Sequence, residues 1–146
     1  MTPEGIFSAA NLTALAGWAV LVAGIIFNHA MLRDILAGRL VPSLLAIVYT
    51  VLILLHWAGS QGDFSSLAGV ASLFANPWLL LAGWVHYLAF DLAIGAMIAR
   101  KVFDEGLPRL LLVPILPLTF LLGPIGWLLF EAIRLIVPRL QRKATQ

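Results

Sequence analysis

The stretch that decides the fold is residues 78–99, Trp78-Leu-Leu-Leu-Ala-Gly-Trp-Val-His-Tyr-Leu-Ala-Phe-Asp-Leu-Ala-Ile-Gly-Ala-Met-Ile-Ala99, which Arg100 and Lys101 follow. At a rise of about 1.5 Å per residue, a helix over this stretch reaches about 33 Å. The hydrocarbon core of a bilayer is about 30 Å thick. The stretch therefore predicts a transmembrane helix that is closed by the two basic residues.

The composition of the whole chain supports this interpretation. Hydrophobic residues make up 62% of the 146 residues and charged residues 11%, and the mean hydropathy is +1.00. Soluble domains carry about 25% charged residues, and disordered chains combine low hydrophobicity with high net charge, so both classes are excluded. The lack of cysteine excludes disulfide scaffolds, thiolate metal sites and thiol nucleophiles. The net charge of +2 is too small to indicate nucleic-acid binding.

The other apolar runs predict an all-α protein with four transmembrane helices in one domain over residues 1–146. The expected spans are about 12–31, 40–58, 78–99 and 109–130, and a basic tail follows at 134–146. Residues 59–77 predict a loop, and 67–74 within it a short interfacial helix. Residues 1–10 hold Glu4 and no Lys or Arg, so we expect a retained span rather than a secretory signal.

The fourth run carries Pro114 and Pro117 and then Gly123-Pro124-Ile-Gly126. Proline removes a helical hydrogen bond and bends the axis, so we expect this helix to be kinked or broken at Gly123-Pro124. Two alternatives are open: the helix is kinked and packs on its neighbours, or it is broken and the break lines a cavity.

The distribution of basic residues determines the orientation of the chain in the membrane only poorly. With four full spans, five basic residues lie on one side and four on the other, which decides little under the positive-inside rule. A fourth run that turned back at Gly123-Pro124 would bring all nine basic residues to one side, but each arm would be too short to cross. We expect four spans with the two short basic loops in the cytoplasm, in an inner or plasma membrane.

Polar residues inside spans are costly and usually face the bundle interior or a cavity. Those within or beside the expected spans are Asn28, His29, Tyr49, His56, His86, Asp91, Thr119 and Glu131. The helical rise spreads the three histidines over the membrane thickness, so no metal site is expected. We expect Glu131 to pair with Arg134 one turn later at an interface.

His86 and Asp91 lie in the middle of the third span. Their spacing of five residues places them about 140° apart around a helix, so they point to different sides. His86 is level with Tyr49, and we expect a hydrogen bond between them. Two alternatives are open for these residues: they join helices, or they bind a ligand or take part in catalysis.

Three motifs carry a family resemblance. They are Trp84-Val-His86-Tyr-Leu-Ala-Phe-Asp91-Leu, Asp104-Glu-Gly-Leu and Gly123-Pro124-Ile-Gly126. With Tyr49 in the second span, they resemble the abscisic-acid-deficient-four-like family, small membrane proteins that include the plant neoxanthin synthase. The similarity covers most of residues 40–129, and Ala93 stands where the family usually has a bulkier residue.

The resemblance implies a membrane protein that binds or isomerises a carotenoid or a similar long apolar molecule. Conversion of an epoxide into an allene needs one group that protonates the oxygen and another that removes a proton. His86, Asp91 and Tyr49 are then the catalytic candidates. The ligand-binding candidates in the chain are Trp84, Asn28, Phe90 and Thr119, and the structural candidates are Gly123, Pro124 and Gly126.

Other functions stay open from the sequence. The chain fits a non-catalytic lipid-binding, pigment-binding or structural membrane protein, and His86 also fits an axial haem ligand. A proton or ion pathway is a weaker alternative. No cofactor motif is present. The expected partners are membrane lipids and an apolar small molecule such as a carotenoid, with no nucleic acid, and self-association is open.

Overall fold

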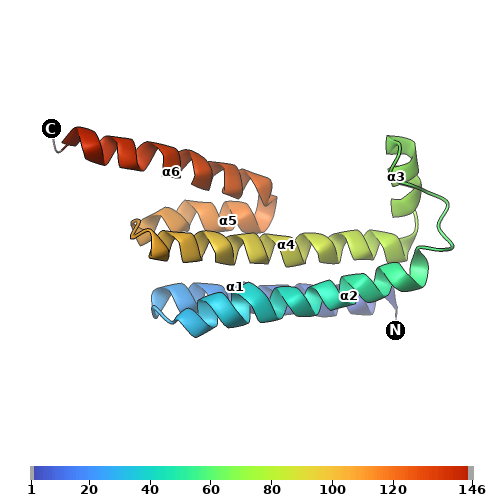
Figure 1. Ribbon diagram of the computed structural model, residues 1–146. Coiled ribbons are helices and arrows are strands. Elements are labelled where there is room, and N and C mark those ends of the chain that lie inside the picture. Colours follow the sequence, from blue (N-terminus) through green and yellow to red (C-terminus); the bar gives the residue numbers. More distant parts are fainter. Residues whose placement is uncertain (1, 145–146) are drawn as a thin grey trace.

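A computed structural model describes residues 2–144 of the chain, and the side chains of residues 2–136. All regular secondary structure in this part is helical. The elements follow one another along the chain (Figure 1) as α1 (Pro3–Ile26), η1 (Met31–Leu40), α2 (Val41–His56), α3 (Leu67–Phe74), α4 (Pro77–Asp104), η2 (Arg109–Leu111), α5 (Leu112–Leu122) and α6 (Pro124–Ala144). The expected all-α fold is confirmed.

Three helical segments are long and apolar enough to cross a membrane. They are Pro3–Ile26, Met31–His56 and Pro77–Asp104. The first expected span is displaced, because α1 already begins at Pro3, where the Thr2 hydroxyl accepts a hydrogen bond from the Gly5 amide at 3.2 Å. Pro3 also suits the first helical position, because it has no amide hydrogen to leave unpaired.

The expected loop before the second span is instead helical. Residues 31–40 form the π-helix η1, which continues into α2 without a break. Its backbone lies against α1, since a Cβ at Gly24 would stand 2.6 Å from the Arg33 nitrogen. Hydropathy alone predicted a loop here because Arg33, Asp34 and Arg39 interrupt the apolar run.

Helix α4 is the centre of the bundle. A Cβ at Gly17 of α1 would meet the Leu92 side chain, and one at Gly95 would meet Trp18 at 2.5 Å. These small residues therefore allow α1 and α4 to pack closely. The apolar core runs along α4, with Val85, Leu92 and Ile98 fully buried.

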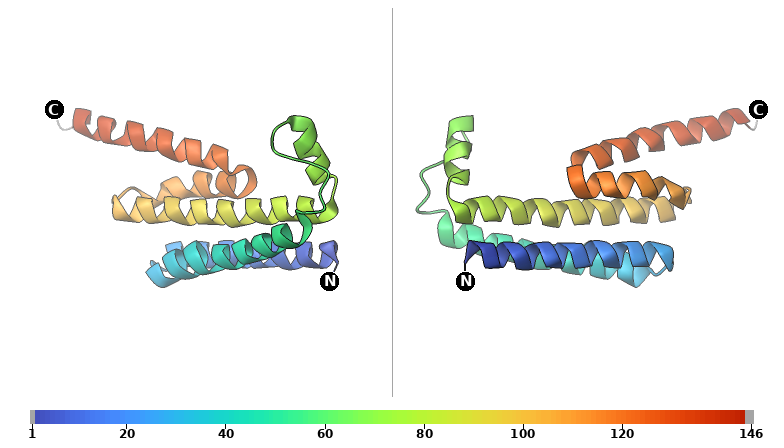
Figure 2. Two further views of the ribbon diagram at one scale, coloured as in Figure 1. Left: turned by 45° about the vertical axis from the view of Figure 1, so that its right-hand side comes forward. Right: turned by 180° about the vertical axis from the view of Figure 1, so that it is seen from behind.

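The short helix α3 spans Leu67–Phe74, as predicted. It stands across one end of the bundle rather than along it (Figure 2). The Ser66 hydroxyl caps it by accepting a hydrogen bond from the Gly69 amide at 3.0 Å.

The fourth expected span is broken at Gly123, as predicted, but the two pieces form a hairpin. Helix α5 has 11 residues and reaches about 16 Å, about half of a hydrocarbon core. After Gly123, α6 runs back along α5 toward the end of α4 (Figures 1 and 2). A fourth complete span is therefore not confirmed.

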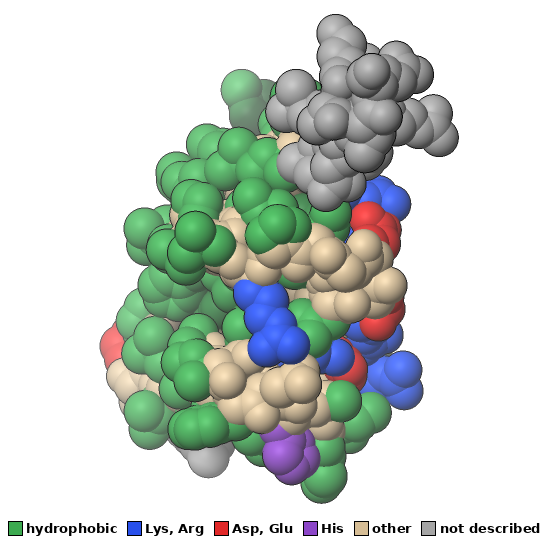
Figure 3. Space-filling view, turned by 90° about the vertical axis from the view of Figure 1, so that its left-hand side faces the viewer, with side chains coloured by type: hydrophobic (Ala, Val, Ile, Leu, Met, Phe, Trp, Pro, Cys, Tyr) green, Lys and Arg blue, Asp and Glu red, His purple; other side chains and the backbone are tan. Residues whose placement is uncertain are grey.

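The hairpin changes the distribution of charge. Arg134 of α6 pairs with Glu105 at the end of α4 at 2.7 Å, and with Glu131 at 3.3 Å as predicted. The expectation that the basic tail begins on the side of the membrane opposite to Arg100 and Lys101 is therefore wrong at Arg134. Figure 3 shows charged side chains gathered at this end of the bundle.

Asp34 and three arginines complete the same end. The Arg33 guanidinium donates two hydrogen bonds to Asp34, at 2.8 and 2.9 Å, and Arg100 lies 3.4 Å from the same carboxylate. Arg33 and Arg109 each lie over the Phe103 ring, at 4.0 and 4.3 Å from its centroid. We call this charged end of the bundle the basic end.

The hairpin makes a testable prediction about topology. Because positive charge favours the cytoplasmic side, we expect the basic end to face the cytoplasm. In intact cells, a tag at the C-terminus and an Asp104→Cys thiol should both be protected from membrane-impermeant reagents. A Gly59→Cys thiol at the opposite end should be labelled. A C-terminal tag and Gly59→Cys accessible from the same side would contradict the hairpin and favour four spans.

Candidate functional site

Helix α4 presents its two mid-span polar residues to different partners. His86 lies beside Tyr49 of α2, and Asp91 lies against Gly123 at the break between α5 and α6. This confirms the prediction from their spacing that the two side chains point to different sides. A compact His86–Asp91 dyad is therefore not formed.

His86 is exposed and contacts two aromatic rings. Its ring centroid lies 5.4 Å from that of Tyr49 and 4.5 Å from that of Phe90, on which it stacks at 22°. No hydrogen bond joins His86 to Tyr49 in the described part of the chain, so the predicted bond is replaced by a ring contact. Phe90 itself is exposed.

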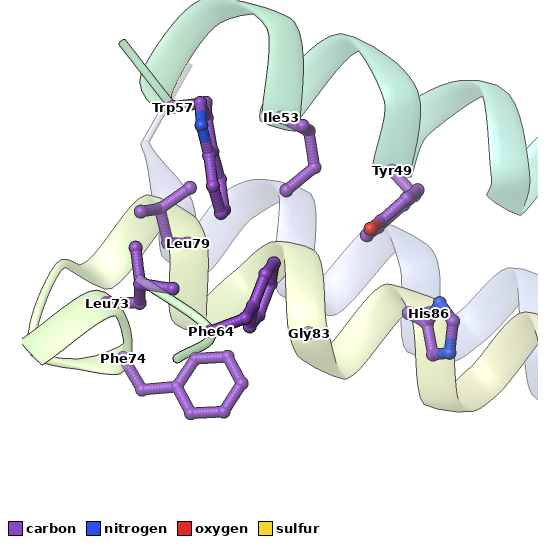
Figure 4. Close-up of a pocket in the computed structure, with 9 residues that line it drawn as sticks. All are labelled: Tyr49, Ile53, Trp57, Phe64, Leu73, Phe74, Leu79, Gly83 and His86. Atoms are coloured by element: carbon purple, nitrogen blue, oxygen red, sulfur yellow. The ribbon is translucent and has the colours of Figure 1, made fainter. Parts of the chain in front are cut away.

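Tyr49 and His86 form one end of a pocket of about 340 Å³ between α2, α4 and α3. We call it the α3 pocket. Figure 4 shows these two polar side chains at one end and Trp57, Phe64 and Phe74 toward the other. Its full lining is Tyr49, Ile53, Trp57, Phe64, Leu73, Phe74, Leu79, Gly83 and His86.

Asp91 occupies the most unusual polar environment in the described residues. The residue is 6% exposed, and its Oδ2 atom is the one buried side-chain polar atom there without a hydrogen-bond partner. Gly123 has a φ of +24°, and a Cβ at this position would collide with Asp91 Oδ1 and stand 3.1 Å from Cγ. The carboxyl group therefore fills the space that a side chain at residue 123 would take.

Tyr87, one turn before Asp91, was missed by the sequence analysis. Its hydroxyl donates a 2.7 Å hydrogen bond to the carbonyl of Leu121, near the end of α5. The last carbonyls of a helix have no partner within it, and in lipid they need one. The position of Tyr87 four residues before Asp91 indicates that the two residues share a helix face, but it does not reveal the partner of the hydroxyl.

The predicted structural residues Gly126 and Pro124 form the turn together with Gly123. A Cβ at Gly126 would lie 2.5 Å from the Thr119 nitrogen and 2.7 Å from its Cα, so the backbones of α5 and α6 touch here. Thr119 is fully buried, and its hydroxyl donates to the Ile115 carbonyl at 2.8 Å. This places Thr119 in the hairpin packing rather than at a ligand surface.

A long surface groove follows α1 on the side of α4 that carries Tyr87. Three hollows, of about 340, 400 and 610 Å³, follow one another along α1. The first two share the lining residues Phe7 and Trp84, and the last two share Leu15 and Phe120. We call them together the α1 groove. They extend from Pro3 and Pro77 at one end to Ile26 and Phe27 at the other.

Aromatic side chains line the α1 groove along its length. Trp84 lies 5.9 Å from Phe7 and 5.5 Å from Tyr87 between ring centroids, and Trp18 meets Phe120 edge-on at 5.4 Å. Trp84 Nε1 also donates to the Asn11 side-chain oxygen at 3.1 Å. The predicted ligand-binding residue Trp84 is thus in the groove wall, whereas Asn28 is exposed in the turn after α1 with a φ of 53°.

Comparison with known families gives one match. The model of the family described as ABA DEFICIENT 4-like matches residues 5–130. The chain belongs to the ABA DEFICIENT 4-like family. No curated protein and no solved structure matches it. The family region of this ABA DEFICIENT 4-like protein includes the α3 pocket, the Gly123 break and the α1 groove except for Pro3 and Glu4, and it ends within α6.

Within residues 2–136, no three His, Asp or Glu side chains come together as a metal site would require. His56 stacks on Trp78, with 4.5 Å between the ring centroids and 7° between the ring planes.

Proposed function

We propose that the protein binds a carotenoid or a similar long apolar molecule in the α1 groove, within the membrane. The observation that carries the proposal is the succession of three hollows along α1, in which neighbouring hollows share lining residues. Helix α1 has 24 residues and rises about 36 Å, which matches the thickness of a hydrocarbon core. A linear molecule that spans the bilayer therefore finds a groove of its own length.

The chemistry of the groove wall supports the same ligand class. Its aromatic row of Phe7, Trp84, Tyr87, Phe120 and Trp18 offers flat faces, which suit stacking on a polyene. Two of its polar groups are already engaged, since Asn11 accepts from Trp84 and Tyr87 donates to Leu121. The groove wall therefore suits a ligand that is mainly hydrocarbon.

The proposal extends to isomerisation, by resemblance to neoxanthin synthase. One group would protonate an epoxide oxygen while its C–O bond breaks, and a base would remove one proton from the neighbouring polyene carbon. The product then carries a hydroxyl group and an allene, with no net change in protons or electrons. Asp91 does not itself line the hollows, but it shares a helix face with Tyr87, which does, whereas His86 and Tyr49 line the α3 pocket. We therefore propose that the proton transfers take place at Asp91.

Trp84→Ala tests the binding proposal. Trp84 lines two of the three hollows and contacts both Phe7 and Tyr87. We expect its loss to weaken carotenoid binding about tenfold, because a buried aromatic contact of this size is worth about 1.5 kcal/mol. Co-purified pigment, quantified by chromatography after expression with a panel of carotenoids, measures this change.

Trp57→Ala is the matched control, since Trp57 lines the α3 pocket and not the groove. It should leave the pigment content unchanged. Absence of pigment from the wild-type protein across the panel would count against the proposal. Equal loss in both variants would place the ligand elsewhere. Pigment bound but never altered would favour a non-catalytic binding protein.

A further inference from the structure

The α3 pocket lies on the opposite face of α4 from the α1 groove. His86 lines the pocket, whereas Trp84 and Tyr87, its close neighbours in sequence, line the groove. In the described structure no residue lines both spaces. A molecule in the groove therefore leaves the α3 pocket free for another ligand.

The polar end of the α3 pocket lacks partners. Neither the Tyr49 hydroxyl nor the imidazole nitrogens of His86 form a hydrogen bond with any described residue, and the two rings meet 5.4 Å apart. Both belong to membrane-spanning segments, where an unsatisfied polar group is costly. A ligand oxygen at this end would satisfy both groups, because a hydroxyl donates and an imidazole nitrogen either donates or accepts.

The other end of the pocket is built for a flat ring. Three aromatic walls come from Trp57 at the C-cap of α2, Phe64 in the following loop and Phe74 in α3 (Figure 4). Phe74 reaches the pocket over Gly83, where a Cβ would stand 3.0 Å from its ring, so glycine admits the ring. The volume of about 340 Å³ falls within the range of about 300–1,000 Å³ for small-molecule sites.

The segment that covers the pocket is fixed by its own hydrogen bonds. Asp63 Oδ1 accepts from the Ser65 hydroxyl at 2.6 Å and from the Ser65 amide at 2.8 Å, and these bonds hold the pKa of the Asp63 carboxyl below its usual range. A Cβ at Gly62 would collide with the Gly69 carbonyl, so the loop packs directly on α3. Phe64, within this segment, contacts Trp57 with 5.2 Å between the ring centroids, and both residues line the pocket.

We propose that the α3 pocket is a second ligand site, which takes a planar ring bearing a carbonyl or hydroxyl oxygen, as in the head group of a membrane quinone. The oxygen meets Tyr49 and His86, the ring lies among the aromatic walls, and a hydrocarbon tail leaves into the lipid. This site is independent of the proposed function, because it uses another face of α4.

A benzoquinone with a short hydrocarbon tail is the probe, titrated calorimetrically into the full-length protein in detergent. Tyr49→Phe should raise its Kd about fivefold to tenfold, the effect of one lost hydrogen bond. Tyr87→Phe is the matched control, since it removes the same hydroxyl from the groove face and should leave the Kd unchanged. His86→Ala should weaken binding at least as much as Tyr49→Phe.

Three results would overturn the inference: no saturable binding, equal effects of the two tyrosine variants, or displacement of the quinone by a groove-bound carotenoid. Thermal unfolding of each variant separates a lost contact from a lost fold. If Tyr49→Phe unfolds, Ile53→Trp, which fills the pocket instead, should abolish quinone binding. Failure of the proposed function would appear separately, as unchanged carotenoid binding in Trp84→Ala.

Discussion

Gly123→Val is expected to lower the free energy of unfolding by about 3 kcal/mol. Two effects act together. A residue with a φ of +24° is strained for valine, and any Cβ there would collide with the Asp91 carboxyl group. The hairpin between α5 and α6 would have to open, and Asp91 would have to move. Thermal unfolding in detergent measures the change, and the readout is the loss of the monodisperse peak.

Gly59→Val provides the matched control. Gly59 also lies in a connecting segment, but nothing stands within 4 Å of a Cβ there. Its stability should stay within about 0.5 kcal/mol of the wild type. A Gly123→Val protein as stable as the Gly59→Val protein would contradict the tight break that the structure shows.

Asp91→Asn is expected to reduce isomerisation about 100-fold or more while carotenoid binding is retained. General acid–base catalysis contributes about 10²–10⁴-fold, and an amide of the same shape cannot exchange the proton. Asparagine preserves the volume that fills the space at Gly123. The rate of product formation, measured by pigment chromatography at saturating carotenoid, separates turnover from binding.

Asp104→Asn serves as its control, because Asp104 is exposed at the end of α4. It should leave both rate and binding unchanged. Normal turnover by Asp91→Asn would remove Asp91 from the chemistry. A variant that loses stability without a specific loss of rate would show instead that Asp91 only joins α4 to the hairpin.

The elements that the sequence predicted well are those defined by composition along the chain. Residues 67–74 form the expected helix because Ser66 caps an apolar run between polar loops. The third span was placed correctly, although α4 extends to Asp104, since charged residues at a helix end do not stop it. Neither result required knowledge of how segments pack.

The hairpin was harder to predict, because hydropathy measures the length of an apolar run and not its direction. Gly123-Pro124 indicated a break, and the charge count hinted that the chain turns back. The deciding contacts join residues far apart in sequence, such as Arg134 with Glu105. The π-helix η1 was not predicted for a related reason. Its buried Arg33 pairs with Asp34 and lies over the Phe103 ring, and the second contact joins residues far apart in sequence.

For the candidate site, helical spacing correctly predicted that His86 and Asp91 point to different sides of α4. The estimated depth in the membrane correctly predicted that Tyr49 lies beside His86. Sequence reasoning had a limit at Tyr87. It could not show the role of Tyr87, because a tyrosine in an apolar span resembles a packing residue until its hydroxyl partner is known. Conversely, the sequence indicates Thr119 as a ligand contact, because it does not show that the hydroxyl already has a partner. Its hydroxyl is satisfied within α5 by Ile115, and Gly126 closes over it.

Fluorescence quenching along the α1 groove tests the central claim most directly. Because the chain has no cysteine, single thiols can be introduced at Leu80→Cys, Leu15→Cys and Val22→Cys, which sample the three hollows, and at Leu54→Cys on α2 as a control. A bound carotenoid that lies along the groove should quench a thiol-linked dye strongly at all three groove positions and weakly at residue 54. Quenching at one groove position alone, or equally strong quenching at residue 54, would contradict a bilayer-length ligand in this groove.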